Sequence, residues 1–339
     1  MNTPFTDKTL NIAWSQLTPD RARIEIRSAI ETAKAAVAAI CQVETPTYDN
    51  TFAALEASGA DLMRAWLRLS HLQSVMDSPE LREVVNELMP EVVIYSSSVT
   101  LNPQLYAVLK QAATCPWVEE LSPVKRRFIE ETLADFRENG AELTPEQKQR
   151  YAELTTKLAQ LSQTFGEYVL DSTNAWEYIT SQPDELAGLP ESAREAARQD
   201  ALSKGHGSEE APAWRFTLQF TSVQPVLTFA DNAELRSKVW HALNDKGTGK
   251  YDTEPFIHEI MVLRAEKAAL LGYERYSDYV TARRMAGSGT TALNFINQLH
   301  DRVYKPFLTE QEAIRCFAEQ VSGTDIPVMA PWDIGYWSE

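Results

Sequence analysis

Apolar residues recur at steps of three and four along most of the chain, which is the spacing of one face of an α-helix. The first such run follows the start signal Thr18-Pro19 and carries Ile26, Ile30, Ala33, Val37 and Ile40. The longest run follows Thr144, which matches a capping box with Gln147 and has proline in the first turn. This second pattern predicts a helix of about 30 residues.

Prolines, glycines and capping residues divide the rest of the helical pattern into shorter pieces. The predicted helices cover about 51–76, the residues after Ser78-Pro79, 105–113, and the residues after Ser122-Pro123 up to Asn139-Gly140. A later helix is predicted to begin at Asp231, with Asp231 as its cap and Glu234 three residues on. We therefore expect helices laid side by side.

The helical period is lost between Trp176 and Pro190. Residues 214–220 alternate large and polar side chains, the pattern of a half-buried strand, and 226–229 is a second possible strand. The predicted fold class is therefore mainly α, a multi-helix bundle with a small β element near 214–229.

The charge of the chain argues against two classes of partner. Its 339 residues include 48 acidic and 32 basic side chains, for a formal net charge of −16, so we expect no nucleic-acid or anionic-membrane partner. No apolar run approaches the ~18 residues of a membrane span, and no leader pattern opens the chain. The three cysteines, Cys41, Cys115 and Cys316, are too scattered for a disulfide framework. We expect a cytoplasmic protein.

No residue of the chain forms a recognisable catalytic, cofactor-binding or metal-binding motif. The five histidines are His71, His206, His241, His258 and His300, and no two of them are four residues apart. His258-Glu259 begins like a zinc helix, but Val262 stands where the second ligand would be, and valine has no donor atom. Gly287-Ser288-Gly289 lacks the lysine of a phosphate loop. We therefore predict no catalytic, cofactor or metal site residues.

Four segments carry a resemblance to a known family. Residues 330–339 resemble its PWD…YYSE segment and 259–273 its ILxLRxEKAxLLGF word, while 181–193 and 235–242 resemble DEAELAGLPESA and ALREEMYRAY. The family is the zinc metallopeptidase family that contains oligopeptidase A, peptidyl-dipeptidase Dcp and thimet oligopeptidase. The resemblance runs over essentially the whole chain.

The resemblance implies a clam-shell fold, of which this chain would be one wall and the opening part of the second. It divides the chain into a helical domain over 1–175, a connecting segment over 176–230 and the helical start of the catalytic domain over 231–339. The connecting segment would hold a short helix from Pro190 to about Ser203 and the small β element. In the family, zinc is bound by a His-Glu-x-x-His helix downstream of the PWD…YYSE segment. No metal or substrate residue of the family falls on this chain.

Two functions of different classes follow from this resemblance. The first is the N-terminal part of a cytoplasmic zinc oligopeptidase that hydrolyses short peptides through zinc-activated water, inactive by itself and completed by a C-terminal catalytic half. The second is a non-catalytic helical protein of the same descent that binds peptides or a partner. A large apolar patch at Leu263, Leu270, Phe295, Trp332 and Trp337 would favour the first. An enzyme with an unrelated site is the third possibility.

Overall fold

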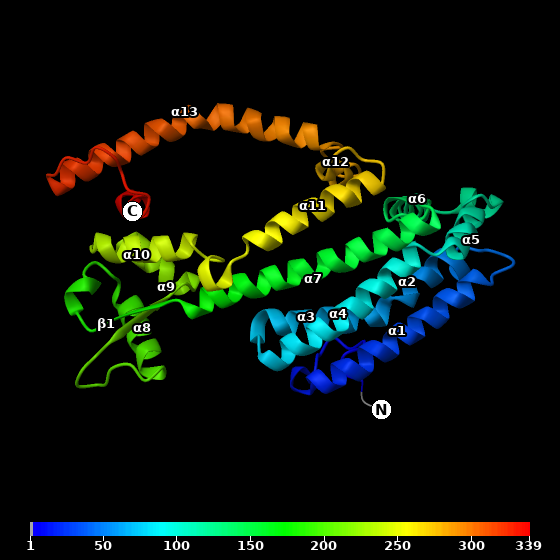
Figure 1. The fold of residues 1–339 in the computed structure, drawn as a ribbon, viewed down its shortest axis with the longest axis horizontal. Helices are drawn as coiled ribbons and strands as arrows, with labels where there is room; N and C mark the ends of the chain where they lie inside the picture. The colour runs from blue at the N-terminus through cyan, green and yellow to red at the C-terminus, as the bar shows by residue number, and fades with distance from the viewer. Residues whose placement is uncertain (1–2) are drawn as a thin grey trace. The chain divides into compact units, whose positions relative to one another are not determined.

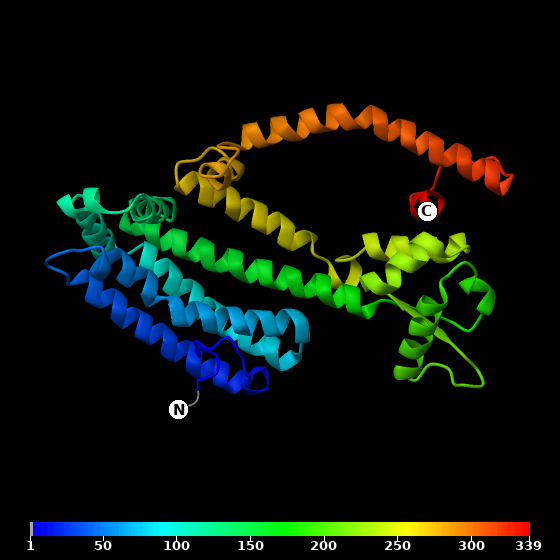
Figure 2. The same ribbon diagram turned by 180° about the vertical axis from the view of Figure 1, so that it is seen from behind.

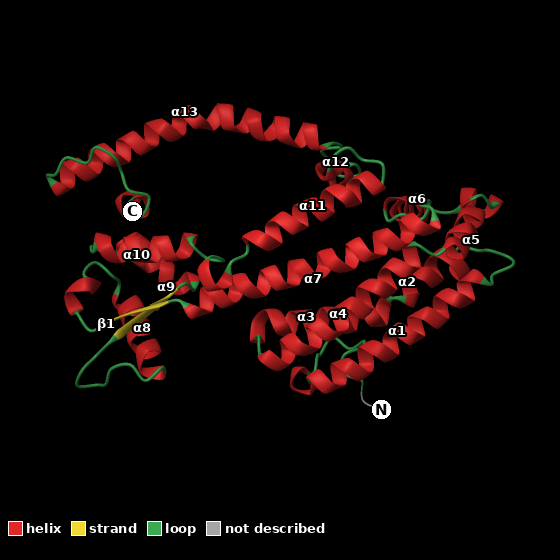
Figure 3. Ribbon diagram, in the orientation of Figure 1, coloured by secondary structure: helices red, strands yellow, loops and turns green. Residues whose placement is uncertain are grey.

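The computed structural model describes residues 3–339, which form two compact units. The first unit contains the chain up to Gln163 together with Ile260–Tyr279, and the second contains Thr164–Glu259 and Val280–Glu339. The predicted mainly α fold class is confirmed, because helices make up most of both units and the described sheet has two strands (Figure 3). The three-part domain division stays a prediction.

The first unit is a bundle of helices. Its elements are α1 (Pro19–Cys41), α2 (Ala54–Ser58), α3 (Ala60–Met76), α4 (Pro79–Thr100), α5 (Pro103–Ala113), α6 (Pro123–Glu138), the first part of α7 (Pro145–Ala175), the second part of α11 (Glu254–Leu270) and the start of α12 (Tyr276–Thr281). Helices α1, α3 and α4 pack side by side (Figures 1 and 2). All five apolar residues predicted to form the α1 stripe are buried.

Local signals in the sequence correctly placed several helix ends. The Thr144 amide donates to the Gln147 side chain at 3.0 Å, and the Gln147 amide donates to Thr144 Oγ1 at 3.3 Å, which confirms the capping box. Gly140 has a φ of +88°, as expected of a glycine that ends a helix. The single run predicted over 51–76 is wrong, because Gly59 separates α2 from α3 and a π-helical turn, Asp49–Ala53, precedes them.

Within the first unit, α11 packs on α7 through charged and aromatic groups. Arg150 Nε donates to Glu266 Oε1 at 2.6 Å, and this hydrogen bond lowers the pKa of Glu266. One residue on, Lys267 Nζ lies 4.7 Å from the centre of the Tyr151 ring, and Tyr151 is 1% exposed. Burial lowers the pKa of Lys267 because the charged ammonium loses hydration. The two helices are thus joined by groups more than 100 residues apart in sequence.

The second unit holds the sheet and the remaining helices. Its elements are β1 (Glu177–Thr180), α8 (Glu191–Ser203), β2 (Trp214–Thr217), α9 (Phe220–Phe229), α10 (Ala233–Asn244), α13 (Gly289–Ser322) and α14 (Ile334–Ser338), with the adjoining parts of α7, α11 and α12. The two strands are antiparallel, and Tyr178 pairs with Phe216. No helix of residues 3–339 is both long and apolar enough to cross a membrane.

Two predictions in this unit are wrong. The strand expected at 226–229 is the end of helix α9, and the partner of β2 is β1. Val223 and Val226 are both buried three residues apart, a spacing that suits one helix face, and a short apolar run alone does not distinguish the two structures. The cap of α10 is Asn232, whose side chain accepts from the Leu235 amide at 3.1 Å, and Asp231 instead accepts a hydrogen bond from Tyr336.

Candidate functional site

The histidines do not gather into a metal site. No group of three or more His, Cys, Asp or Glu side chains that could hold a metal occurs within residues 3–339. His258 is exposed on α11, and Val262, one turn further, offers no donor atom, so the described residues do not fit the zinc of a His-Glu-x-x-His helix. Of the other four histidines, three contact aromatic rings.

Three histidines contact aromatic rings. The His241 ring lies 5.1 Å from that of Trp240 and 5.2 Å from that of Trp332. The His300 ring stacks on Tyr304 at 5.0 Å, and the His71 ring lies 5.4 Å from that of Trp14. His206, the fifth histidine, lies between Gly205 and Gly207 in the loop after α8.

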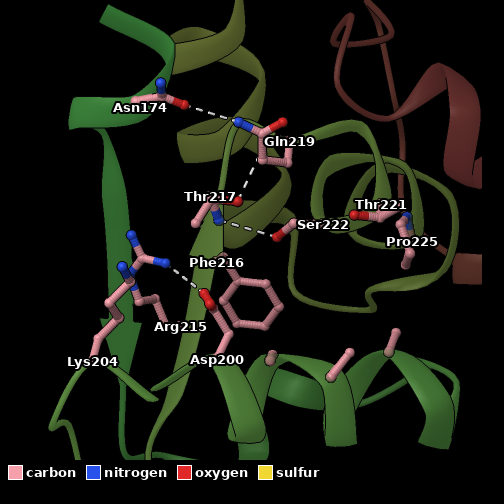
Figure 4. A pocket seen from close by; sticks show the side chains of 13 residues that line it. Asn174, Asp200, Lys204, Arg215, Phe216, Thr217, Gln219, Thr221, Ser222 and Pro225 are labelled. Atoms are coloured by element: carbon pink, nitrogen blue, oxygen red, sulfur yellow. Dashed lines mark hydrogen bonds and ion pairs between the residues drawn. The ribbon is translucent and has the colours of Figure 1, made fainter. Parts of the chain in front are cut away.

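A cavity of about 480 Å³ opens between α8, β2 and the start of α9 (Figure 4). Its lining residues are Asn174, Ala193, Ala196, Ala197, Asp200, Lys204, Arg215, Phe216, Thr217, Gln219, Thr221, Ser222 and Pro225. Neither histidine nor cysteine is among these lining residues. The cavity therefore has the chemistry of a polar binding hollow, and its lining offers no histidine or cysteine as a general base or nucleophile.

Ion pairs and hydrogen bonds occupy several of the polar groups of this cavity. Arg215, with 11% of its side chain exposed, donates to Glu177 at 2.6 Å and to Asp200 at 2.5 Å. The hydrogen bond from Arg215 lowers the pKa of Glu177. Ser222 Oγ accepts from the Thr217 amide at 3.0 Å, which ties the start of α9 to β2 (Figure 4). These contacts join β2 to β1, α8 and α9.

A second constellation fixes the last segment of the chain to α10. Arg236, 3% exposed, donates from Nε and Nη2 to Asp333 Oδ1 at 3.0 and 2.5 Å. Its guanidinium lies 4.1 Å from the centre of the Tyr336 ring. The Tyr336 hydroxyl donates to Asp231 Oδ1 at 2.8 Å, and this bond, together with burial, raises the pKa of Tyr336. Two segments that resemble family words, around 235 and around 333, therefore meet at one ion pair.

The five apolar residues chosen from the sequence differ in exposure. Leu263, Leu270, Trp332 and Trp337 are half-buried, whereas Phe295 is 66% exposed. Sequence reasoning assigned no site residue, and it missed the lining of the cavity and the Arg236 anchor. The alternation around Arg215 signalled a strand, but nothing in the sequence signalled which carboxylates that arginine meets.

Comparison with known proteins identifies the family. Residues 226–339 match the model of "Peptidase family M3", and 25–148 match that of "Neurolysin/Thimet oligopeptidase, N-terminal domain". The chain is 33% identical over 332 residues to Oligopeptidase A of Haemophilus influenzae. This match covers 96% of the present chain and 48% of the relative. The chain belongs to peptidase family M3.

Other members of the M3 family match over the same extent. Oligopeptidase A of Escherichia coli is 31% identical over 333 residues, and dipeptidyl carboxypeptidase of the same organism is 24% identical over 329 residues. Each match covers 96% of this chain and 48% or 47% of the relative. The chain thus spans about half the length of the curated relatives it matches, in their N-terminal half. The resemblance read from the sequence is confirmed.

Proposed function

We propose that this chain is the N-terminal half of a zinc-dependent oligopeptidase that hydrolyses short peptides in the cytoplasm. The observation that carries the proposal is the unbroken similarity to oligopeptidase A along 96% of the chain, which accounts for 48% of the H. influenzae relative. The cytoplasmic location draws on a further relative, the "Probable cytosolic oligopeptidase A" of Arabidopsis thaliana, 30% identical over 317 residues.

The role proposed for this half is to shape and narrow the substrate channel. Packed helices such as α1, α3 and α4 form a rigid wall, and a wall that admits only short unfolded peptides needs no catalytic side chain of its own. Zinc in the complete enzyme would activate a water for attack on the peptide carbonyl. Since residues 3–339 offer no group of three metal-ligating side chains, the zinc ligands would come from the half of the relatives that this chain does not span.

A chimera tests the proposal directly. Residues 1–339 would be joined to the remaining half of H. influenzae oligopeptidase A, and cleavage of a quenched fluorescent peptide of about ten residues would be followed. We expect zinc-dependent cleavage that a chelator abolishes and added zinc restores. The chain alone should cleave nothing.

Two controls make the result of the chimera decisive. A chimera with Gln in place of the zinc-helix glutamate should bind zinc and remain inactive, since that glutamate is the general base. If the unchanged chimera folds and binds one zinc but fails to cleave peptides that the parent H. influenzae enzyme cleaves, the proposal is overturned.

A non-catalytic peptide-binding protein is the second candidate, favoured by the polar cavity around Arg215. Peptides of five to ten residues would be titrated into the chain by calorimetry, with product analysis of the same samples. Saturable binding without cleavage, weakened by Arg215→Met, supports this candidate. Absence of saturable binding, together with an active chimera, excludes it.

A further inference from the structure

A long stretch of helix α13 is exposed on all sides. Every residue from Leu293 to Glu310 is exposed. The helix packs on α14 near its C-terminal end, where the centres of the Phe317 and Trp337 rings lie 6.4 Å apart. Figures 1 and 2 show α13 as one long curved helix. A helix of this kind draws most of its stability from packing of an apolar face, and no residue of this stretch is buried.

The exposed stretch carries a continuous apolar face, here named the α13 stripe. Its members are Leu293, Ile296, Leu299, Val303 and Phe307, which are 49–59% exposed. At 3.6 residues per turn these side chains fall within about 120° of the helix circumference. A contiguous exposed apolar face of this kind marks an interaction surface.

A hollow around Pro306 lies along the stripe. A cavity of about 680 Å³ is lined by His300, Val303, Tyr304, Pro306, Phe307 and Glu310. Pro306 lies inside α13 and has no N–H to bond the preceding turn. The hollow suits a globular partner that inserts a side chain into it.

We propose that the α13 stripe is the docking face for the polypeptide that corresponds to the other half of the oligopeptidase A relatives. This inference rests on the proposed function. The match to "Peptidase family M3" begins at residue 226 and includes all of α13, and the relatives that cover 96% of this chain are about twice its length. The relatives thus contain, in addition to everything described here, a second half of similar size to cover such a face.

A second copy of this chain fits the stripe poorly. A coiled coil would need apolar residues at alternating steps of three and four over at least three heptads. From Leu293 that series reaches His300 and Glu310, both of which are polar. Each copy also carries a formal charge of −16, so two copies repel each other.

A membrane surface or a nucleic acid fits no better. The side of α13 opposite the stripe carries Arg302 and Lys305 beside Asp301, and Glu312 follows within two turns. These charges cancel, whereas helices that bind anionic lipids or phosphates have a basic polar face. The partner is therefore a protein surface with apolar side chains at its centre.

Binding of the separated halves tests the docking face. The full chain would be mixed with the separately produced remaining half of H. influenzae oligopeptidase A, and the complex measured by sedimentation velocity and calorimetry. Val303→Glu places a charge in the stripe and should weaken binding by about 30-fold or more, as expected of a central interface residue. Gln298→Glu adds the same charge on the opposite side of the helix and should change binding less than threefold.

Both substituted positions are exposed, so both variants should fold like the unchanged chain, which circular dichroism and thermal unfolding would verify. If Val303→Glu binds as tightly as Gln298→Glu, the docking face lies elsewhere and the inference is overturned. It is also overturned if the chain alone forms a dimer that Val303→Glu dissolves, because the occupant is then a second copy.

A measurement on the covalent chimera guards against a separated half that does not fold. The amide hydrogens of residues 293–310 should exchange at least tenfold more slowly in the chimera than in the chain alone. Equal exchange would refute the docking face even if the chimera cleaves peptides, which leaves the proposed function intact. Conversely, an inactive chimera with strong protection at 293–310 refutes the proposed activity and keeps the docking face.

Discussion

Replacement of Asp333 by Asn is expected to loosen the last segment of the chain. The substitution keeps the shape of the side chain but removes the negative charge that faces Arg236, which is 3% exposed. Two carbonyl groups still compensate the guanidinium, since Arg236 Nη1 donates to Ala230 O at 2.5 Å and to Asp231 O at 3.2 Å. The Tyr336 ring also remains beneath it.

These remaining partners set the size of the effect. Removing one member of a buried ion pair costs about 3–5 kcal/mol when the other charge is left alone. Asp333 is 20% exposed at its side chain and the carbonyl groups stay, so we expect Asp333→Asn to lower the free energy of unfolding of this unit by about 2–3 kcal/mol. Faster amide exchange over 334–338 should accompany the loss.

Urea unfolding followed by tryptophan fluorescence measures this change, because Trp240 and Trp332 lie 5.8 Å apart in the same unit. Asp301→Asn is the matched control, since Asp301 is 81% exposed at its side chain and should change stability by less than about 0.5 kcal/mol. A double-mutant cycle with Arg236→Met isolates the pair. A coupling energy below about 0.5 kcal/mol would refute the anchoring role of the ion pair.

Three further predictions concern single side chains. Gly188→Ala should lower the free energy of unfolding by more than about 2 kcal/mol in urea unfolding, because a Cβ there would clash with Phe229 O at 2.2 Å. Gly205→Ala is the control, since a Cβ there meets no atom within 4 Å and should cost only the ~1–2 kcal/mol of its positive φ. The hydrogen bond from Arg315 lowers the pKa of Glu312 to about 2, so a carbon-detected NMR titration should show Glu312 protonating only near that pH. Arg315→Gln should raise this pKa toward 4.5. The stability that this pair contributes is present at a pH above the pKa of Glu312 in the unfolded chain, and it is lost as the pH falls through the pKa in the folded chain. Leu69→Ala removes a fully buried side chain and should lower the free energy of unfolding by about 2–5 kcal/mol in the same urea assay.

The sequence predicted those parts of the fold that depend on neighbours three or four residues apart. The Thr144–Gln147 capping box and the end of α6 at Gly140 are local, and both were correctly placed. The pairing of β2 with β1 joins strands that are separated by the whole of α8. The pattern along the chain did not reveal this partner, and the strand predicted at 226–229 was wrong. Periodicity within one segment carries no information about such partners.

The candidate site was less predictable for the same reason. Arg236 and Asp333 are 97 residues apart, and Arg215 finds one carboxylate in β1 and another in α8. Family resemblance marked the segments that contain Arg236 and Asp333 but not their contact. The exposure of the α13 stripe could likewise be learned only from the folded chain.

The order in which the two units are completed has a consequence for synthesis on the ribosome. The first unit is interrupted after Gln163 and resumes only at Ile260, so its last helices emerge after most of the second unit has been made. At about 5–20 residues per second, roughly 6–23 s pass between the translation of Gln163 and that of Tyr279. Until Lys267 has been made, the side of α7 around Tyr151 lacks the contact that covers it in the folded protein.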